Sequence, residues 1–387
     1  MPVSDKSFRA DSAAPVPAAE RGSRAGAPPA RSSASLPFVS VLMPVRNEGA
    51  FMERSLGAVL HQTYPADAFE VIVADGMSTD ATRETIKALA ERHPNLQSID
   101  NVGRIVSTGL NAALRRARGE IIIRVDGHCE IAPDYIERCV THLRESGAEI
   151  VGGPLTTLGE TAVAGVIAVA MSSPFGVGNS AFRTGQMTAF VDTVAFPAYP
   201  RRLLQDAGPF DEELVRNQDD EYNYRLRKMG ARILLAQDVT SRYYSRSSFK
   251  SLWRQYFQYG YWKVRVMQKH PRQMRPRQFA PPLFVAGLAA LLLLSIGSTW
   301  AALAFLGTVG LYLCANLAAT IVTARQTGWR QMPALSLAFA TLHVSYGAGF
   351  LVGLARFWNR WGDHSTFVGA PTLDASKSAP PAPRSSR

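Results

Sequence analysis

The sequence predicts an α/β fold with a doubly wound, mixed but mostly parallel sheet, followed by an interfacial helix and about three transmembrane helices. Short apolar runs that fit buried strands alternate with stretches that fit helices through residues 38–154. An aromatic and basic stretch follows at 248–269, and residues 279–324 contain no charged side chain. Alternation at this spacing is typical of a parallel sheet with helices on both faces.

The first half of the chain predicts strands and helices in regular order. Strands are expected at residues 38–44, 70–75, 96–99, 120–126 and 149–154, and helices at 49–62, 80–92, 104–117 and 133–145. Two of these strands end on a carboxylate, Asp75 and Asp126. Because the carboxyl ends of parallel strands share one edge, and ligands bind at that edge, both residues are candidates for a binding site.

From residue 160 the pattern changes. The sequence predicts an apolar helix, a glycine-rich loop, a strand, a turn, a polar helix and a last strand, at residues 162–171, 175–183, 192–199, 208–212, 217–230 and 231–236. With these elements the predicted catalytic domain spans residues 37–247.

Composition narrows the function classes. The net charge of +11 favours an anionic partner, but no isolated polybasic face is visible, which disfavours nucleic acid. The three cysteines, Cys129, Cys139 and Cys314, have neither disulfide nor zinc spacing and are expected to be reduced thiols. Residues 1–36 are rich in Ala, Pro, Ser and Arg and have no signal-peptide core, so we expect a disordered leader and a cytoplasmic domain after it.

The last third predicts membrane attachment. Residues 248–277 are expected to form an amphipathic interfacial helix and a basic linker, or else a helix packed on the globular domain. The apolar region 279–355 divides into three spans of roughly 20 residues each, at 279–297, 300–323 and 333–355. The basic flanks place the first two spans as a hairpin with its ends inside, and the third span then leaves a disordered tail, 356–387, outside. The positive charges of Arg356 and Arg360 disfavour an outside position for the tail. The alternative is that one of the three segments enters the membrane and returns to the same side.

Motifs in residues 37–265 resemble a known family. Val-Leu-Met-Pro-Val-Arg-Asn-Glu, Val-Ala-Asp-Gly-Met-Ser-Thr-Asp and Asp-Gly-His match the inverting glycosyltransferases of family 2, which have the GT-A (nucleotide-diphospho-sugar transferase) fold. Phe-Gly-Val-Gly-Asn-Ser-Ala-Phe-Arg, Val-Asp-Thr-Val-Ala-Phe and Arg-Asn-Gln-Asp-Asp-Glu-Tyr-Asn-Tyr-Arg are similar to the succinoglycan-type exopolysaccharide glucosyltransferases, which also carry C-terminal membrane helices.

The resemblance implies a nucleotide-sugar site at the strand ends. Asp75 would accept a hydrogen bond from the uracil N–H or a ribose hydroxyl, with a loop or helix-cap acceptor as the alternative. Pro44 and Glu48 would shape the first nucleotide loop, where Glu48 reaches the ribose or caps the helix starting at residue 49. Arg104 would steer the diphosphate, or lie solvated at a helix start.

Asp126 and His128 stand where the family usually has Asp-x-Asp. Carboxylate oxygens suit Mg²⁺ or Mn²⁺, and imidazole is a poor ligand for Mg²⁺ but an acceptable one for Mn²⁺. His128 falls on the position of the family's metal ligand, and Asp126 would bind the metal or the ribose. The resemblance therefore implies a divalent cation, with Mn²⁺ favoured over Mg²⁺, unless His128 is only a polar loop residue.

The resemblance also implies the catalytic base. Counting back from Arg225, Asp219 aligns with the family's carboxylate that deprotonates the acceptor hydroxyl, and Asp220 is the runner-up. An acidic helix N-terminus stabilised by the helix dipole is compatible with this role. Gln218 stands where the family usually has Glu, and Arg225 is expected to pair with Asp220 or Glu221.

Other residues are expected to position donor or acceptor, together with Gln218 and Arg225. Arg183 and Asp192 would contact the sugar or acceptor, or form internal ion pairs. Gln255 is all that remains of the Gln-x-x-Arg-Trp motif of processive synthases, which indicates a single transfer.

The expected function is therefore a membrane-anchored transferase that moves a hexose, from UDP-glucose, to a polyprenyl-diphosphate-linked acceptor. Its partners would be the UDP-sugar, the lipid-linked sugar and membrane lipids, at a bacterial-type inner (plasma) membrane that it crosses several times, with the catalytic domain cytoplasmic. A sugar-phosphate nucleotidyltransferase would need a glycine-rich basic loop after the first strand, which Pro-Val-Arg-Asn-Glu is not. A non-catalytic component of a polysaccharide assembly is the alternative, which His128 supports and the acids around Asp219 oppose.

Overall fold

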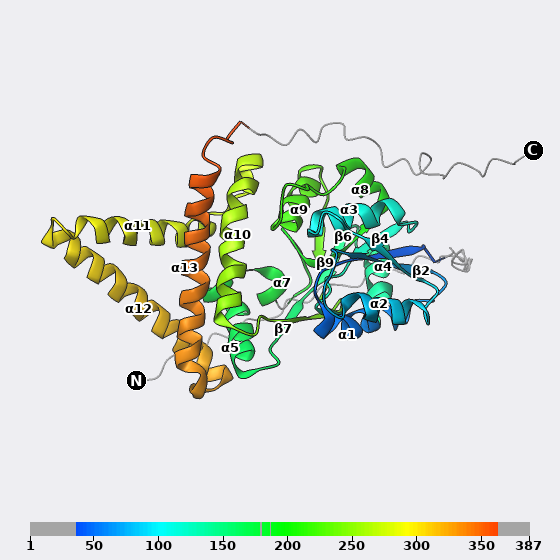
Figure 1. Ribbon diagram of the computed structural model, residues 1–387, viewed down its shortest axis with the longest axis horizontal. Coiled ribbons are helices and arrows are strands. Elements are labelled where there is room, and N and C mark those ends of the chain that lie inside the picture. Colours follow the sequence, from blue (N-terminus) through cyan, green and yellow to red (C-terminus); the bar gives the residue numbers. More distant parts are fainter. Residues whose placement is uncertain (1–35, 179, 186, 363–387) are drawn as a thin grey trace, which may run out of the picture. The chain divides into compact units, whose positions relative to one another are not determined.

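The computed structural model describes residues 36–178, 180–185 and 187–362 of the chain (Figure 1). The predicted leader lies outside these residues except for Leu36, and so does the part of the predicted tail after residue 362. The alternation predicted for the first half is confirmed. Its elements are β1 (Val39–Val45), α1 (Gly49–Leu60), β2 (Phe69–Asp75), α2 (Thr82–Ala90), β3 (Leu96–Asp100), α3 (Val106–Arg116), β4 (Ile121–Arg124), α4 (Tyr135–Glu145) and β6 (Ile150–Gly153).

The strands form an eight-stranded mixed sheet in the order β3-β2-β1-β4-β9-β6-β10-β8. The first four are parallel, β9 (Ala195–Pro200) runs antiparallel to both β4 and β6, and β10 (Ile233–Leu235) lies between β6 and the edge strand β8 (Ala189–Val191). β1 pairs with β2 on one side and β4 on the other, with Val41 opposite Val71 and Ile123. This register brings the carboxyl ends of β2 and β4 to one edge, as the sequence predicts.

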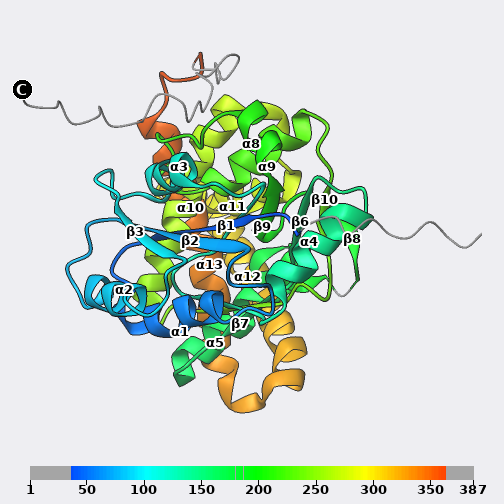
Figure 2. The same ribbon diagram turned by 90° about the vertical axis from the view of Figure 1, so that its right-hand side faces the viewer.

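Helices cover both faces of this sheet (Figure 2). Along β1, Val41 and Met43 belong to one buried core, which α1 and α4 complete, whereas Leu42 belongs to the core on the other face. That second core is completed by α3, α8 (Arg201–Ala207) and α9 (Gln218–Lys228). The apolar strand runs of the sequence therefore reflect burial on both faces.

A second sheet, which the sequence did not predict, has the order β5-β11-β7. Its strands are β5 (Cys129–Ile131), β11 (Ser241–Tyr244) and β7 (Leu155–Leu158). β11 is antiparallel to β5 and parallel to β7. Strands of three or four residues whose partners are about a hundred residues away carry no readable periodicity.

The segment predicted as a glycine-rich loop at 175–183 is instead largely helical. It contains two one-turn helices, α6 (Pro174–Val177) and α7 (Ala181–Thr184). Pro174 stands at the first helical position of α6, and the Ser173 hydroxyl accepts from the N–H of Phe175. Helices of a single turn leave no periodic pattern in the sequence, so the two glycines of this segment favoured a loop.

The long aromatic helix α10 (Phe249–Lys269) packs along α13 (Met332–Arg356) at very short range. A Cβ on Gly260 of α10 would lie 2.0 Å from the carbonyl oxygen of Tyr346, and one on Gly349 of α13 would lie 2.0 Å from that of Phe257. Small residues thus let the two backbones touch. Both helices, and α5 (Ala162–Met171), also contribute side chains to the core beneath the large sheet. The predicted boundaries at residues 247 and 277 therefore do not separate independent cores.

The remaining apolar helices are α11 (Ala280–Leu294) and α12 (Thr299–Thr327), with the break between them where the sequence places it. Three described helical stretches are long and apolar enough to cross a membrane: 276–294, 299–327 and 329–356. After α13 the chain was expected to be disordered, but Phe357 is buried and Arg360 pairs with Glu213. An aromatic ring and an arginine that find partners on the domain explain this ordered end.

Candidate active site

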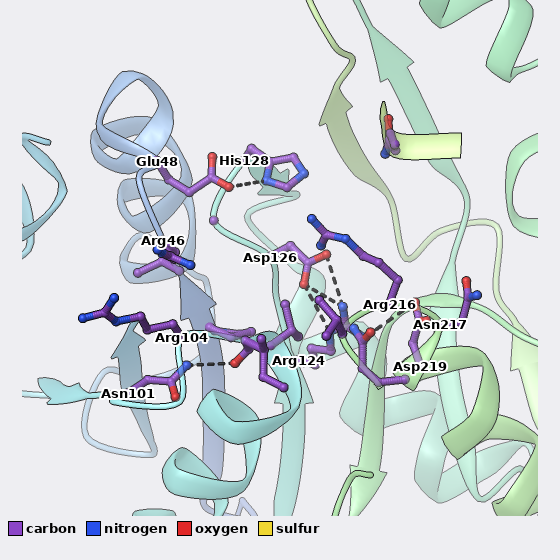
Figure 3. Close-up of a pocket in the computed structure, with 18 of the residues that line it drawn as sticks. Arg46, Glu48, Asn101, Arg104, Arg124, Asp126, His128, Arg216, Asn217 and Asp219 are labelled. Carbon is purple, nitrogen blue, oxygen red and sulfur yellow. Dashed lines mark hydrogen bonds and ion pairs between the residues drawn. The ribbon is translucent and has the colours of Figure 1, made fainter. Parts of the chain in front are cut away.

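A cavity of about 320 Å³ opens at the carboxyl ends of β1 and β4 (Figure 3). Four regions of the chain line it: the loop after β1, the segment before α3, the loop after β4, and a wall built by the start of α9, β11 and α10. The lining residues include Pro44, Arg46, Glu48, Asn101, Arg104, Arg124, Asp126, His128, Arg216, Asn217, Gln218, Asp219, Tyr243, Arg246, Gln255 and Tyr259. The cavity thus occupies the sheet edge at which ligands are expected to bind.

The loop after β1 is fixed by its contacts with the turn after β2. Asn47 has a left-handed backbone (φ 54°), and its N–H donates to Ser78 Oγ at 2.9 Å. The N–H of Glu48 donates to Thr82 Oγ1 at 2.8 Å. These bonds hold the backbone on both sides of Asn47 so that Arg46 and Glu48 reach the cavity wall.

Arg124, the last residue of β4, holds two carboxylates together. Its Nη2 and Nε donate to Asp126 Oδ1 at 2.9 and 3.1 Å, and its Nη1 lies 3.7 Å from Asp219 Oδ2. The Arg124 side chain is 9% exposed and that of Asp219 is 51% exposed. Burial opposes the charge on Arg124, but Asp126 and Asp219 offset it and raise the pKa of the guanidinium above its ordinary value. One buried cation is therefore shared by acids 93 positions apart in the sequence, Asp126 and Asp219.

His128 faces the loop after β1. Its Nδ1 lies 2.9 Å from Glu48 Oε1, and its ring packs edge-on against Tyr243 with 5.0 Å between centroids. A carboxylate that is hydrogen-bonded to one ring nitrogen fixes the orientation of the imidazole and so the direction of the other nitrogen. This arrangement is common for histidines that bind metals. Glu48 holds the N-cap position of α1 but its side chain makes no cap bond there, so its carboxylate serves His128 instead.

The donor set suits a cation that shares its coordination with a substrate. Among the residues that the structure describes, no group of three or more His, Cys, Asp or Glu side chains could hold a metal ion by itself. A cation that accompanies a nucleotide diphosphate needs only one or two protein ligands, because phosphate oxygens and water complete its shell. Asp126 and His128, two positions apart at one cavity wall, fit this smaller set.

The cavity is positively charged overall. Its arginines outnumber its carboxylates, Glu48, Asp126 and Asp219; they are Arg46, Arg104, Arg124, Arg216 and Arg246. Arg104 has a left-handed backbone (φ 60°), and the neighbouring Asn101 donates to the carbonyl of Ile105 at 2.8 Å. A left-handed non-glycine residue is strained and is kept where surrounding contacts enforce it. The excess of positive charge suits an anionic ligand such as a diphosphate.

The start of α9 separates the two candidate bases. Asn217, which precedes α9, also has a left-handed backbone (φ 63°). From this turn Gln218 and Asp219 line the cavity. Asp220 does not line the cavity and instead forms an ion pair with the buried Lys263 of α10. The geometry thus places Asp219, and not Asp220, at the cavity.

α10 closes the cavity with an aromatic and amide wall. Gln255 Nε2 donates to the hydroxyls of Tyr243 at 3.2 Å and Tyr259 at 3.0 Å, and Asn217 Nδ2 donates to the carbonyl of Tyr259. The side-chain carbonyl oxygens of Gln218 and Gln255 are buried without a hydrogen-bond partner in the described part of the chain. Buried acceptors that line a cavity suit a ligand with hydroxyl donors.

Asp75 ends β2 at the predicted edge but does not line the cavity. It is 1% exposed, accepts from the N–H of Ser78 at 3.1 Å and lies 3.5 Å from Arg83 Nε. The structure therefore gives Asp75 the contacts of a loop acceptor, the alternative that the sequence left open.

Three other predicted residues also lie outside the cavity lining. Arg183 donates to Thr157 Oγ1 at 2.8 Å, and Asp192 pairs with Arg227 at 2.7 Å and with Arg275. Arg225 pairs with the fully buried Glu221 at 2.8 Å, one of its two expected partners. Their contacts are those of internal ion pairs and hydrogen bonds.

Sequence reasoning overlooked several lining residues, among them Arg46, Asn101, Arg124, Arg216, Tyr243, Arg246 and Tyr259. Arg46 and Arg124 could have been predicted from the sequence, because each lies two positions from a residue that was already a candidate for the site. Tyr243 and Arg246 could not be found, since β11 was not recognised as a strand beside His128.

Comparisons with known proteins identify the family and the fold of the chain. The model of the glycosyl transferase family 2 matches residues 40–162. The succinoglycan biosynthesis protein ExoA of Rhizobium meliloti (strain 1021) is 31% identical over 327 residues, which cover 83% of this chain and 96% of that protein. The dolichyl N-acetyl-alpha-D-glucosaminyl phosphate 3-beta-D-2,3-diacetamido-2,3-dideoxy-beta-D-glucuronosyltransferase of Methanococcus voltae is 28% identical over 240 residues, covering 60% and 74% of the two chains.

Among solved structures, the mannosyltransferase PcManGT from Pyrobaculum calidifontis, in complex with GDP-Man and Mn²⁺, superposes with a TM-score of 0.52. It is 22% identical and the match covers 82% of this chain and 88% of that one, which shows a shared fold. The mixed sheet with its strand-end cavity, and the match to ExoA along nearly its whole length, lead to one conclusion. The chain belongs to glycosyl transferase family 2 and is a glycosyltransferase with a GT-A-like fold.

Proposed function

We propose that this glycosyltransferase inverts the anomeric centre as it moves a hexose, glucose from UDP-glucose, to a polyprenyl-diphosphate-linked sugar in the assembly of an exopolysaccharide or other cell-surface glycan. The observation that supports this most is the cavity in which Asp219, Arg124, Asp126 and His128 converge. The relative named for succinoglycan biosynthesis supports a surface polysaccharide, and the dolichyl phosphate relative supports a lipid-linked acceptor.

Asp219 is proposed as the catalytic base. The acceptor hydroxyl oxygen attacks the anomeric carbon, the bond from that carbon to the phosphate oxygen breaks, and its electron pair leaves with UDP. The hydroxyl proton passes to the carboxylate of Asp219, which is half exposed and lines the cavity. Arg124, whose Nη1 lies 3.7 Å from Oδ2 of Asp219, helps to hold this carboxylate at the cavity.

The diphosphate is proposed to lie among the arginines of the cavity. A divalent cation at Asp126 and His128 would offset charge on the phosphates. Arg104, Arg216 and Arg246 line the same space and supply further positive charge. The unpaired amide oxygens of Gln218 and Gln255 are proposed acceptors for sugar hydroxyls.

The experiment that tests this function is a donor screen. The full chain is incubated with labelled UDP-glucose, UDP-galactose and UDP-N-acetylglucosamine in membranes that contain native polyprenyl-linked sugars, with Mn²⁺ present. We expect label in the lipid fraction with UDP-glucose and release of UDP in equal amount. Tight UDP binding without release of UDP in any lipid extract would contradict the proposal and favour a non-catalytic assembly component.

We also propose that the catalytic domain faces the cytoplasm at a bacterial-type inner membrane. Arg272, Arg275 and Arg277 precede α11. Arg325 lies in the last turn of α12 and Arg330 follows it, so both ends of this hairpin are basic. Basic flanks are retained on the cytoplasmic side.

A further inference from the structure

We propose that α13 does not cross the bilayer. It lies along the membrane surface with one face on the catalytic domain, so that α11 and α12 alone enter the hydrocarbon and both ends of α13 stay on the side of the catalytic domain. This inference concerns membrane topology and does not depend on the proposed function.

The first half of α13 is part of the core of the catalytic domain. Leu335, Phe339 and Leu342 belong to the same buried cluster as the side chains of β1. The ring of Phe339 packs edge-on against Phe175 at 5.1 Å, and Nε2 of His343 lies 2.8 Å from the carbonyl oxygen of Phe175. This end of α13 is therefore fixed to the domain through α5 and α6.

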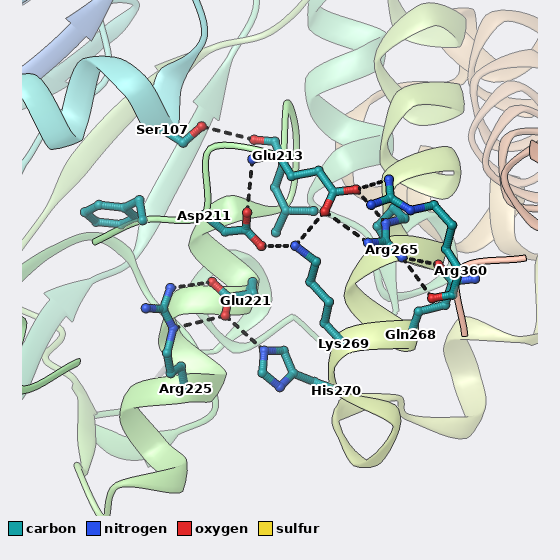
Figure 4. Close-up of polar contacts among 12 residues, drawn as sticks. Ser107, Asp211, Glu213, Glu221, Arg225, Arg265, Gln268, Lys269, His270 and Arg360 are labelled. Atoms are coloured by element: carbon teal, nitrogen blue, oxygen red, sulfur yellow. Dashed lines mark hydrogen bonds and ion pairs between the residues drawn. The ribbon is translucent and has the colours of Figure 1, made fainter. Parts of the chain in front are cut away.

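The far end of α13 is fixed to the same domain by polar contacts (Figure 4). Gln268 Nε2 donates to the carbonyl of Phe357 at 2.7 Å, and Arg360 Nη1 lies 2.7 Å from Glu213 Oε1. Arg265, fully buried on α10, pairs with the same Glu213 at 2.8 Å. Glu213 precedes α9, next to the loop that forms one cavity wall.

Contacts at both ends are incompatible with a crossing. α13 has 25 residues and is about 37 Å long, which exceeds the roughly 30 Å of a hydrocarbon core. A spanning helix of this length would carry α10 into the bilayer beside it. α10 holds Lys263, Arg265 and Lys269, and its end pairs with Asp211 of the catalytic domain through Lys269. Charged groups at that depth are costly.

α11 and α12 behave differently. Within an apolar stretch of 18 residues in each candidate span, 6% is buried in the protein for the first span and 11% for the second, against 50% for the third. Figure 1 shows α11 and α12 leaving the α10–α13 pair to one side, while α10 and α13 run next to each other. Ile296, between α11 and α12, is 87% exposed. Apart from their contacts with each other and with α13, these two helices therefore leave most of their surface for lipid.

The charges around α13 agree with this arrangement. Arg325 and Arg330 stand before it, and Arg356 and Arg360 stand at its end. Basic residues at both ends retain both ends on the same side of the membrane. The outer face of α13, with Leu337 at 53% and Val352 at 48% exposure, fits the boundary between headgroups and acyl chains.

Cysteine labelling of the full chain tests the topology. Cys129 and Cys139 are buried, so replacing the exposed Cys314 with Ala gives a quiet background. Single cysteines are then placed at Arg330 before α13, at Asn359 after it, and at Arg202, 91% exposed on α8, as the marker of the catalytic side. A membrane-impermeant maleimide is applied to right-side-out and to inverted vesicles, and UDP binding shows that each variant is folded.

We expect Arg330→Cys, Asn359→Cys and Arg202→Cys to react in the same vesicle orientation. Reaction of the first two in opposite orientations would overturn the proposal, as would failure of either to react until detergent is added. A fluorescent protein fused after residue 387 checks the result without altering α13. Protease added to the vesicles should remove it in the same vesicle orientation in which Arg202→Cys is labelled, and protection of the fusion in that orientation would contradict the proposal.

Discussion

Arg124 lies between the two carboxylates to which the proposed reaction assigns different tasks. It donates to Asp126, a proposed cation ligand, and approaches Asp219, the proposed base. Replacing this shared cation with a neutral amide removes the ion pairs that hold the two carboxylates in place. The Arg124→Gln variant should therefore lower kcat for transfer more than it raises KM for the UDP-sugar.

Initial rates over a range of UDP-sugar concentrations measure kcat and KM separately. Arg104→Gln is the matched control, because Arg104 lines the cavity and has no carboxylate partner among the ion pairs of the described residues. It should raise KM for the UDP-sugar and change kcat little. An unchanged kcat in Arg124→Gln would contradict this role and show that the arginine only packs the cavity floor.

Asp219 and Asp220 form a natural pair for testing the base. Asp219→Asn should reduce transfer by about 100-fold or more and leave UDP binding nearly intact, because a general base contributes about that much. Asp220→Asn breaks the ion pair with Lys263 and should cost much less activity. Single-turnover rates and UDP titrations measure the two effects. Loss of UDP binding in Asp219→Asn would point to a structural role for this residue.

His128 predicts a metal preference. If its free ring nitrogen binds the cation while Glu48 holds the other, Mn²⁺ should support faster transfer than Mg²⁺. His128→Asp should narrow that gap, because a second carboxylate suits Mg²⁺ better. Initial rates at matched free metal concentrations test this. Equal rates with both metals in the unmodified protein would show that His128 is not a ligand.

At the scale of elements, Glu213 joins α10 and the end of α13 to the loop before α9. Although partial burial opposes its charge, hydrogen bonds from Arg265 and Lys269 lower the pKa of Glu213 from 4.5 to about 2. A pKa lowered on folding stabilises the fold above pH 4.5, and the contribution is lost as the pH falls through 4.5 toward 2. Acidic pH should therefore weaken the contacts that join α10 and the end of α13 to the loop before α9.

The variant Glu213→Gln should be destabilised by about 3 kcal/mol at neutral pH, since it removes the carboxylate that pairs with the buried Arg265 and with Lys269, and should lose less stability on acidification. Thermal unfolding in detergent between pH 7 and pH 3 measures both effects. Asp206→Asn, which alters an exposed pair with Arg202, should match the unmodified protein. A Glu213→Gln curve parallel to that of the unmodified protein would contradict the assignment.

The elements also show what sequence patterns can and cannot reveal. Ile121–Ile123 with Asp126 was predictable, because a buried strand leaves a continuous apolar run and its end is fixed by topology. Asp75 also stands at the end of a buried strand, but its carboxylate accepts a hydrogen bond from the N–H of Ser78. The conformation of the following loop, which the sequence pattern does not show, determines this contact. The pairing of β5 with β11 depends on tertiary contacts that no local pattern records.

At the scale of the molecule, hydropathy identified three apolar helices correctly but could not distinguish contact with lipid from contact with protein. A leucine facing acyl chains and Leu335 facing the core of the sheet look the same in a window average. The domain boundary expected at residue 277 therefore marks a change in composition. The hydrophobic core of the catalytic domain nevertheless includes side chains of α13.

This continuity makes a prediction about truncation. A chain that ends at residue 277 lacks Leu335, Ala338, Phe339 and Leu342, and so exposes the core surface that they cover. We expect it to be proteolysed rapidly and to bind UDP at least tenfold more weakly than the full chain in detergent. Limited proteolysis and UDP titration measure this. A truncated protein with full UDP affinity would show that the catalytic domain is self-sufficient.

The placement of α13 in that core also orders events during synthesis. The ribosome synthesises the sheet, α5 and α10 before it reaches Leu335. Until then, the nascent catalytic domain lacks the α13 side chains that cover part of its core. α11 and α12 are also synthesised before α13, so both precede the segment that completes the core. On the proposed topology, folding of the catalytic domain is therefore completed only after the α11–α12 hairpin has entered the bilayer, which links maturation of the enzyme to its arrival at the membrane.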